Sequence, residues 1–248
     1  LFAYGKISTL KIPESVKEIG KMAFYYNTGL QRVEMPSSLE VLGDNAFIGC
    51  QALEEAAIPE SVHKIGDNMF GGCSVLKKVT LPEMLDSIGQ YAFQYCTGLE
   101  EIQLPSRLTY IGSSAFLGCS GLKTVNIPES LVRMDIPVFI ECGNLTSPLY
   151  NSTLFVCLPT SYQGEYTVPD GIKAVAGGAF SSCNQLTAVN LPASVEKLGY
   201  AVFEQCTSLE RVNLPEGITS ILNYTFQDCS KLQGVSLPSH LTHIGDGA

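Results

Sequence analysis

Cysteines are the residues of this sequence whose type and spacing most suggest chemistry. Eight of the nine occupy one position of a repeating pattern, and Cys157 is the exception: Cys50, Cys73, Cys96, Cys119, Cys142, Cys183, Cys206 and Cys229. Neighbouring strands lie about 4.8 Å apart, a distance that a disulfide permits. Asn27 fills the same position one repeat earlier, however, and stacked side chains point in parallel. We therefore expect free, buried thiols in a small site that offers backbone hydrogen-bond partners.

No other arrangement of catalytic groups or metal ligands stands out. The cysteine series contains no C-x-x-C pair and no nearby histidine that would complete a zinc shell. His240 and His243 form an H-x-x-H pair close to Asp246, but both histidines occupy repeat positions that we expect to be exposed. The sequence has no phosphate-binding loop, dinucleotide fingerprint or serine-hydrolase motif. We predict no enzyme activity, no metal site and no cofactor.

Acidic residues directly follow the proline of several repeats, namely Glu14, Glu60, Glu83, Glu129, Asp170 and Glu216. Stacked repeats would align these residues along one edge of the molecule. Ca²⁺ needs several oxygen ligands around one point, and other repeats carry serine or alanine at this position. We interpret the column as solvated turns that bias the surface towards basic partners.

The overall composition disfavours two classes of partner. The chain has 248 residues, of which 45% are hydrophobic, and a formal net charge of −9. An acidic protein lacks the Lys- and Arg-rich face that nucleic acid requires, and it is repelled by anionic membranes. No apolar run reaches the roughly 18 residues of a membrane-spanning helix. We predict neither nucleic-acid binding nor membrane insertion.

Prolines show how the chain is organised. They recur every 23 residues from Pro13 to Pro128 and again from Pro169 to Pro238. Pro128 and Pro169 are 41 residues apart rather than 23, so that 18 additional residues enter, roughly within positions 146–166. A strict period in this range is typical of a solenoid. We predict one solenoid domain over residues 1–248, with about ten coils, as a fragment open at both ends.

Each position of the unit L-x-x-V/I-x-L-P-x-x-V/L-x-x-I-G-x-x-A-F-x-x-C-x-x-L has a structural interpretation. The alternation before the proline predicts a half-buried strand, which the proline ends because it has no N–H. A second apolar run ends at a glycine, at positions 20, 43, 66, 89, 112, 199 and 245. We expect this glycine to supply a positive φ or a close approach between coils. The apolar spacing in A-F-x-x-C-x-x-L predicts a short helical or 3-10 turn.

The expected fold class is therefore an α/β repeat solenoid, a right-handed coil of short parallel strands and helical turns. Phenylalanines recur at 24, 47, 70, 93, 116, 139, 180, 203 and 226, and we expect them to stack into an aromatic spine. The coil after Pro128 is irregular, because Met134-Asp135 replaces Ile-Gly and Pro137 stands beside Phe139.

The unit, shown whole by LEEIQLPSRLTYIGSSAFLGCSGL from Leu99 onward, resembles the BspA-like, treponemal-type leucine-rich repeat. The insertion, with PLYNSTLF from Pro148 and YTVP from Tyr166, is similar to hairpin-like interruptions in such arrays. Leu1-Phe2 leading to Pro13 echoes Leu154-Phe155 leading to Pro169. The resemblance implies surface or secreted proteins, mostly bacterial, with adhesion to host proteins or other cells as the usual role. It implies no catalytic residues and no cofactor.

The outward face of the first strand of each repeat is our main candidate for a binding surface, because solenoids commonly bind with an extended sheet face. Its short, polar side chains of mixed charge include Arg32, Glu34, Glu55, Lys78, Thr80, Glu101, Gln103, Asn126, Asn190, Arg211 and Asn213. The alternative is a face that serves only solubility.

The insertion is the second candidate, with Tyr150, Phe155, Tyr162 and Tyr166 as possible interface anchors. The alternative for these aromatic residues is a local hairpin packed over the irregular coil.

The function that these features favour is a non-enzymatic, extracellular scaffold for protein binding or adhesion. Its partner would be a protein, for example one of the host matrix or of a cell surface, and no oligomeric state is predicted. The rival hypothesis is a carbohydrate-binding or cell-envelope element that acts as a spacer and presents another domain. Glycan binding would favour aromatic platforms on the strand face, where the sequence places almost none.

Overall fold

Short strands and tight turns make up the chain over residues 2–134 and 137–248, which the computed structural model describes. Asp135, which we expected to disturb the irregular coil, lies outside these residues. Contacts divide the chain into two compact units, Leu1–Asn144 and Leu145–Ala248, which are described in turn. Both follow the 23-residue period, and each unit is a β-solenoid, with about ten turns counted over the two. The right-handed sense of the coil and the single domain over residues 1–248 stay predictions.

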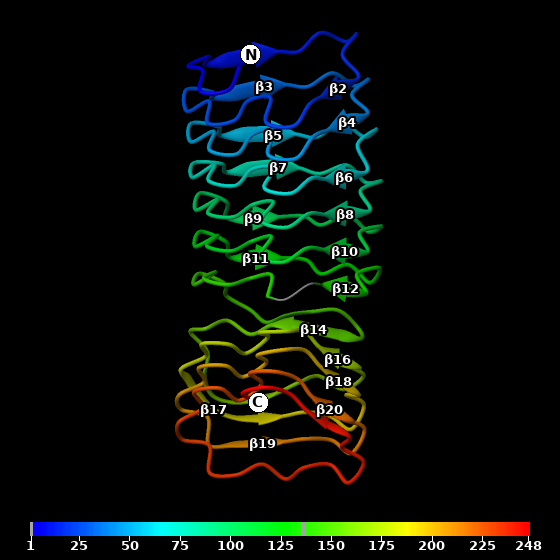
Figure 1. Cartoon of the computed structure of the whole chain (residues 1–248), viewed down its shortest axis with the longest axis vertical. Helices are drawn as coiled ribbons and strands as arrows, with labels where there is room; N and C mark the ends of the chain where they lie inside the picture. The colour runs from blue at the N-terminus through cyan, green and yellow to red at the C-terminus, as the bar shows by residue number, and fades with distance from the viewer. Residues whose placement is uncertain (1, 135–136) are drawn as a thin grey trace. The chain divides into compact units, whose positions relative to one another are not determined.

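In the first unit the strands form two rows, each running along the stack of coils (Figure 1). The first row follows the alternation before each proline and comprises β1 (Thr9–Lys11), β3 (Arg32–Glu34), β5 (Glu55–Ala57), β7 (Lys78–Thr80), β9 (Glu101–Ile102) and β11 (Thr124–Val125). The second row follows the run that ends at glycine and comprises β2 (Glu18–Ile19), β4 (Val41–Leu42), β6 (Lys64–Ile65), β8 (Ser87–Ile88), β10 (Tyr110–Ile111) and β12 (Arg133–Met134).

Most neighbouring strands of each row pair in parallel and in the register of the repeat. Thr9 lies beside Arg32, Glu55 beside Lys78, and Ile88 beside Ile111. Because the register equals the period, each side chain meets its own counterpart in the next coil, and apolar columns form the core.

The expected aromatic spine is present in the first unit. Its rings stack from Phe24 through Phe47, Phe70, Phe93 and Phe116 to Phe139, with centroids 5.0–5.7 Å apart and planes within 14° of parallel. Phe2 stacks on Phe24 at 5.4 Å and extends the column. Phe47, Phe70, Phe93 and Phe116 are fully buried, so the spine is the centre of a dry core.

The prediction of helical turns is wrong, because no helix occurs among the described residues. In the A-F-x-x-C segment only alternate amides bond within the coil. Ile48 and Cys50 donate to carbonyls three residues back, whereas Phe47 and Gly49 donate to Met69 and Gly71 of the next coil. Asn45 and Gly49 have φ of 60° and 73°, which no α-helix allows. The spacing of three and four arises from successive tight turns instead.

The repeat glycine works through close approach rather than through a positive φ. A Cβ at Gly112 would lie 2.7 Å from the backbone nitrogen of Gln90 in the preceding coil, and one at Gly43 would lie 2.5 Å from that of Lys21. Positive φ occurs elsewhere, two residues before the phenylalanine and two after it, and there non-glycine residues such as Met22 and Tyr26 adopt it.

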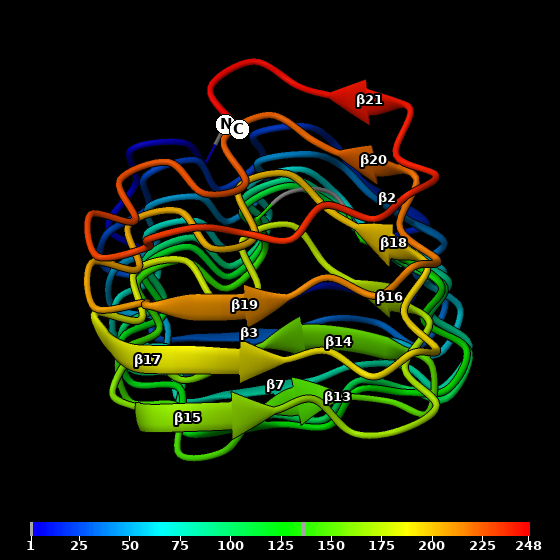
Figure 2. The ribbon, with the colours of Figure 1, turned by 90° about the horizontal axis from the view of Figure 1, so that it is seen from below.

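The second unit has the same two rows of strands but begins with the strands of the insertion (Figure 2). Its first row comprises β15 (Gln163–Thr167), β17 (Gln185–Asn190) and β19 (Arg211–Asn213). Its second row comprises β14 (Leu154–Cys157), β16 (Ala174–Val175), β18 (Lys197–Leu198), β20 (Ser220–Ile221) and β21 (His243–Ile244). The expected hairpin exists, since β13 (Leu149–Tyr150) pairs antiparallel with β14. Both β14 and β15 also pair in parallel with the next coil, so the insertion is built into the sheets of this unit.

A test of the aromatic spine is the variant Phe116→Ala. Removing this buried ring leaves a cavity between two stacked neighbours, and we expect a loss of about 3–5 kcal/mol in the free energy of unfolding. Urea denaturation measures the loss, with Tyr91→Ala at an exposed aromatic residue as the control. A loss below about 1 kcal/mol for Phe116→Ala would contradict the packing described here.

A matched pair of glycines tests the close approach between coils. Gly112→Ala forces a methyl group against the backbone of the preceding coil and should destabilise by about 1–3 kcal/mol. Gly20 holds the same repeat position, but a Cβ there meets nothing within 4 Å. Gly20→Ala should therefore leave thermal stability unchanged or slightly higher. Equal effects of the two substitutions would refute a steric role for this glycine.

Candidate functional site

The residues expected to form a binding surface lie on one strip of the first unit. They are exposed and lie on or directly after the first-row strands, with Arg32 and Glu34 on β3, Glu55 on β5, Lys78 and Thr80 on β7, Glu101 on β9, Gln103 after β9 and Asn126 after β11. Glu34 forms ion pairs with Lys11 at 3.6 Å and with Arg32 at 3.7 Å. The strip thus runs across neighbouring coils and combines residues far apart in sequence.

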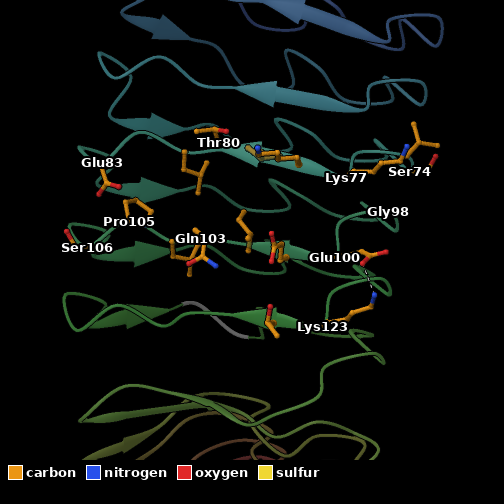
Figure 3. Close-up of a pocket in the computed structure, with 18 residues that line it drawn as sticks. Ser74, Lys77, Thr80, Glu83, Gly98, Glu100, Gln103, Pro105, Ser106 and Lys123 are labelled. Atoms are coloured by element: carbon orange, nitrogen blue, oxygen red, sulfur yellow. Dashed lines mark hydrogen bonds and ion pairs between the residues drawn. The ribbon is translucent and has the colours of Figure 1, made fainter.

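A groove of about 1,240 Å³ opens on this strip over β7, β9 and β11. Lys78, Thr80, Glu101 and Gln103 are among the residues that line it. Figure 3 shows Lys77, Glu100 and Lys123 along one side, and Glu83, Pro105 and Ser106 along the other. The Lys123 Nζ donates to Glu100 Oε2 at 2.6 Å, and this hydrogen bond lowers the pKa of the Glu100 carboxyl. The groove therefore lies on the outward face of the strands, with charged and polar sides, while the side chains of Val79 and Ile102 are buried in the core beneath it.

Two of the predicted asparagines hold coils together. The Asn126 amide accepts a hydrogen bond from the Leu104 N–H at 2.7 Å and donates to the Leu104 carbonyl at 2.7 Å. Asn213 bonds the backbone of Leu191 in the same way, with both distances at 2.8 Å. In other coils the equivalent N–H donates instead to a backbone carbonyl of the next coil, as Ile58 does to Thr80. These amides therefore contribute to the fold, and their role in binding a partner stays a prediction.

In the second unit, Glu165 of the insertion organises the strand face. Its carboxylate accepts from Arg211 Nη2 at 2.6 Å and from Asn190 Nδ2 at 2.6 Å. Arg211 reaches across the intervening strand, where Ala188 is in register with both charged residues and is too small to block the contact. The predicted residues Asn190 and Arg211 are thus brought together by a residue that pattern analysis did not select.

The aromatic residues of the insertion mostly serve the core. Phe155 is fully buried and stacks on Phe180 at 5.0 Å, so its interpretation as an exposed contact is corrected. Tyr166 and Tyr162 are half-buried and pack against each other with their centroids 5.3 Å apart. Burial raises the pKa of Tyr166 to about 12. Tyr150, with 45% of its surface exposed, is the one of the four that presents a large face to solvent.

The cysteines are free, as expected from Asn27. In most coils the thiol donates to the carbonyl of the phenylalanine 26 residues earlier, for example Cys96 Sγ to Phe70 O at 3.2 Å and Cys119 Sγ to Phe93 O at 3.0 Å. Asn27 Nδ2 donates to Phe2 O at 3.3 Å and so performs the same task one coil earlier. The position selects small hydrogen-bond donors, which explains why asparagine can stand in for cysteine in one coil.

Burial gives these thiols unusual acid–base properties. Desolvation raises the pKa of Cys50, Cys142 and Cys206 to about 12 and that of Cys229 to about 11. The pKa values of Cys73 and Cys96 are also raised, first by burial and then by neighbouring thiols of the ladder. Because the thiolate is the reactive form, these residues are inert as nucleophiles near neutral pH.

The remaining polar patterns are structural as well. In the acidic column, Glu216 accepts hydrogen bonds from the Ser239 hydroxyl and N–H at 2.8 and 3.0 Å, which lower its pKa, and Glu60 accepts from the Glu83 N–H. His240 and His243 are exposed, and within the described ranges no group of three or more His, Cys, Asp or Glu residues is arranged to hold a metal ion. No helix long and apolar enough to cross a membrane is found in the described part of the chain.

The 23-residue coil, the parallel first row and the stacked leucine and phenylalanine columns define a leucine-rich-repeat solenoid. The chain belongs to the family described as the BspA type leucine rich repeat region, which matches over residues 1–96, 40–166 and 157–248. No curated protein matches the chain.

Similar solved structures include proteins of three bacteria. A leucine-rich cell surface protein of Faecalibacterium prausnitzii shares 24% identity, with a TM-score of 0.58 over 98% of this chain and 79% of that one. A leucine-rich repeat protein of Bacteroides ovatus shares 26% identity, with a TM-score of 0.59 over 98% and 76%. The pneumococcal vaccine antigen PcpA shares 26% identity, with a TM-score of 0.64, and the match covers 96% of this chain but only 58% of PcpA.

The buried thiols predict how stability depends on pH. The thiol of an unfolded cysteine has a pKa of about 8.5–9, whereas burial raises the pKa of the folded thiols above this value. Their contribution to stability is therefore complete below the unfolded pKa and is lost as the pH rises above it. We expect the free energy of unfolding in urea to fall between about pH 8 and pH 10.

Cys96→Ala serves as the comparison, because it removes one such thiol. The slope of stability against pH should then be less steep by up to about 1.4 kcal/mol per pH unit. Identical slopes for the two proteins would show that the Cys96 thiol does not resist ionisation in the folded state.

Proposed function

We propose that the chain is a non-enzymatic protein-interaction scaffold and that the groove over β7, β9 and β11 binds its protein partner. The observation that carries this proposal is the position of the groove. It opens on the first-row strand face, where Lys78, Thr80, Glu101 and Gln103 line it. Stacked coils make such a face long and rigid, which favours recognition of a macromolecule over a small substrate.

We further propose that the protein acts at the cell surface or outside the cell, in adhesion to a host matrix or cell-surface protein. Membership of the BspA-type family and likeness to a protein described as a leucine-rich cell surface protein support this location. The formal net charge of −9 favours partners with basic surfaces.

The rival function is carbohydrate binding, or a cell-envelope spacer that presents another domain. Sugar sites use exposed aromatic faces, and none of the residues that line the groove is aromatic. The groove therefore favours a protein partner. Beyond the groove, the same strand face is also polar, because it carries the exposed, charged side chains of Arg32, Glu34 and Glu55.

A double variant that fills the groove tests the proposal. Thr80→Arg with Gln103→Arg places two long side chains in the groove, and Gln51→Arg adds one at an exposed turn of the same unit. We expect saturable binding to at least one member of a panel of matrix and cell-surface proteins, measured by surface plasmon resonance. The double variant should lose at least about tenfold in affinity and the control should not.

Binding that survives the double variant would remove the groove from the proposal. A protein panel without saturable binding, together with binding on a glycan array, would replace the proposal with its rival.

A further inference from the structure

Three residues of the groove region form a strip of alternating charge. Glu55 on β5, Lys78 on β7 and Glu101 on β9 occupy the same repeat position in consecutive coils. Glu55 and Lys78 are in register, and Lys78 and Glu101 both line the groove. All three side chains are exposed. Beyond Arg32, which is in register with Glu55 and pairs with Glu34, the face thus presents a negative, a positive and a negative charge in a row across the strands.

These charges differ from their neighbours in being unpaired. Within the residues that the structure describes, no hydrogen bond or ion pair engages the side chains of Glu55, Lys78 or Glu101. One position earlier in the repeat, Lys77 pairs with Glu54 at 3.1 Å and Lys123 pairs with Glu100 at 2.6 Å. The charged residues one position earlier in the repeat are therefore paired within the protein. The column of Glu55, Lys78 and Glu101 is unpaired and can interact with charges of a partner.

The spacing of the free charges matches a particular chain geometry. Strands lie about 4.8 Å apart, so two coils separate the Glu55 and Glu101 positions by about 9.6 Å. A polyproline II segment has three residues per turn and a rise of about 3.1 Å, which places residues three apart on one face at about 9.3 Å. An extended chain laid across the strands would set two such residues against the two carboxylates.

We propose that this strip binds an extended segment of a protein partner with two basic residues three positions apart and no basic residue between them. The inference rests on the proposed function of the groove and adds the chemistry of its partner. The two carboxylates attract the basic side chains, whereas Lys78 between them repels a third cation. The lysine thus excludes uniformly basic segments, which an acidic protein would otherwise attract without selection.

Three labelled peptides test the proposal by fluorescence anisotropy on the whole chain. The first, Gly-Pro-Arg-Pro-Asp-Arg-Pro-Gly, carries the expected pattern. The second exchanges each charge for its opposite, and the third replaces the aspartate with lysine. At low salt the first peptide should bind about tenfold more tightly than either of the others, and high salt should abolish its binding. Equal binding of the three peptides, or no binding of the first, would overturn the proposal.

Single substitutions assign the effect to the strip. Glu101→Gln keeps the shape of the side chain and should weaken the first peptide several-fold, whereas Glu18→Gln at an exposed second-row position should not. Lys78→Ala should allow the third peptide to bind as well as the first. Unchanged discrimination in Lys78→Ala would refute the role of the lysine.

The same variants separate this inference from the function on which it rests. A protein partner that the groove-filling double variant abolishes, but that Glu101→Gln and Lys78→Ala leave unaffected, would keep the scaffold and refute its charge selectivity.

Discussion

Bonding between each coil and the next is the constraint on which the rest of the structure depends. A strand of two or three residues is too short to be stable alone, and each coil satisfies many of its backbone and side-chain polar groups through its neighbour. Phenylalanine stacks on phenylalanine, and thiols donate to carbonyls of the preceding coil. Glu60 likewise accepts a hydrogen bond from the backbone N–H of Glu83 in the next coil. Strict periodicity in the sequence is the consequence of this repeated contact.

The period made much of the fold predictable. Proline spacing indicated the coil, the alternation before it indicated the first strand row, and the shared position of Asn27 with the cysteines indicated free thiols. The turns were not predictable in the same way, because spacings of three and four suit both a helix and a run of tight turns. Hydrogen bonds to the next coil decide between them, and these are properties of the stack rather than of a local segment.

The candidate site was predictable as a surface but not in its details. Repeat position alone placed Arg32, Lys78 and Glu101 on one face. It could not show that the Asn126 amide hydrogen-bonds to the backbone of Leu104, or that Glu165 accepts hydrogen bonds from Arg211 and Asn190. These contacts depend on how side chains bridge particular coils. Nor could it show that Phe155 enters the core, since the insertion breaks the period on which the prediction relied.

The thiol ladder also bears on how such a protein changes length. Most thiols of the ladder lie 26 residues from their acceptor carbonyl, one period plus the three residues from phenylalanine to cysteine. Loss or duplication of a 23-residue unit would therefore rejoin every donor to an equivalent acceptor, and the stacked rings would meet as before. A deletion of any other length would put all columns out of phase together. Arrays of this kind are thus able to grow and shrink in whole units, whereas the 18 additional residues before β16 are accommodated in a differently built coil made of β13, β14 and β15.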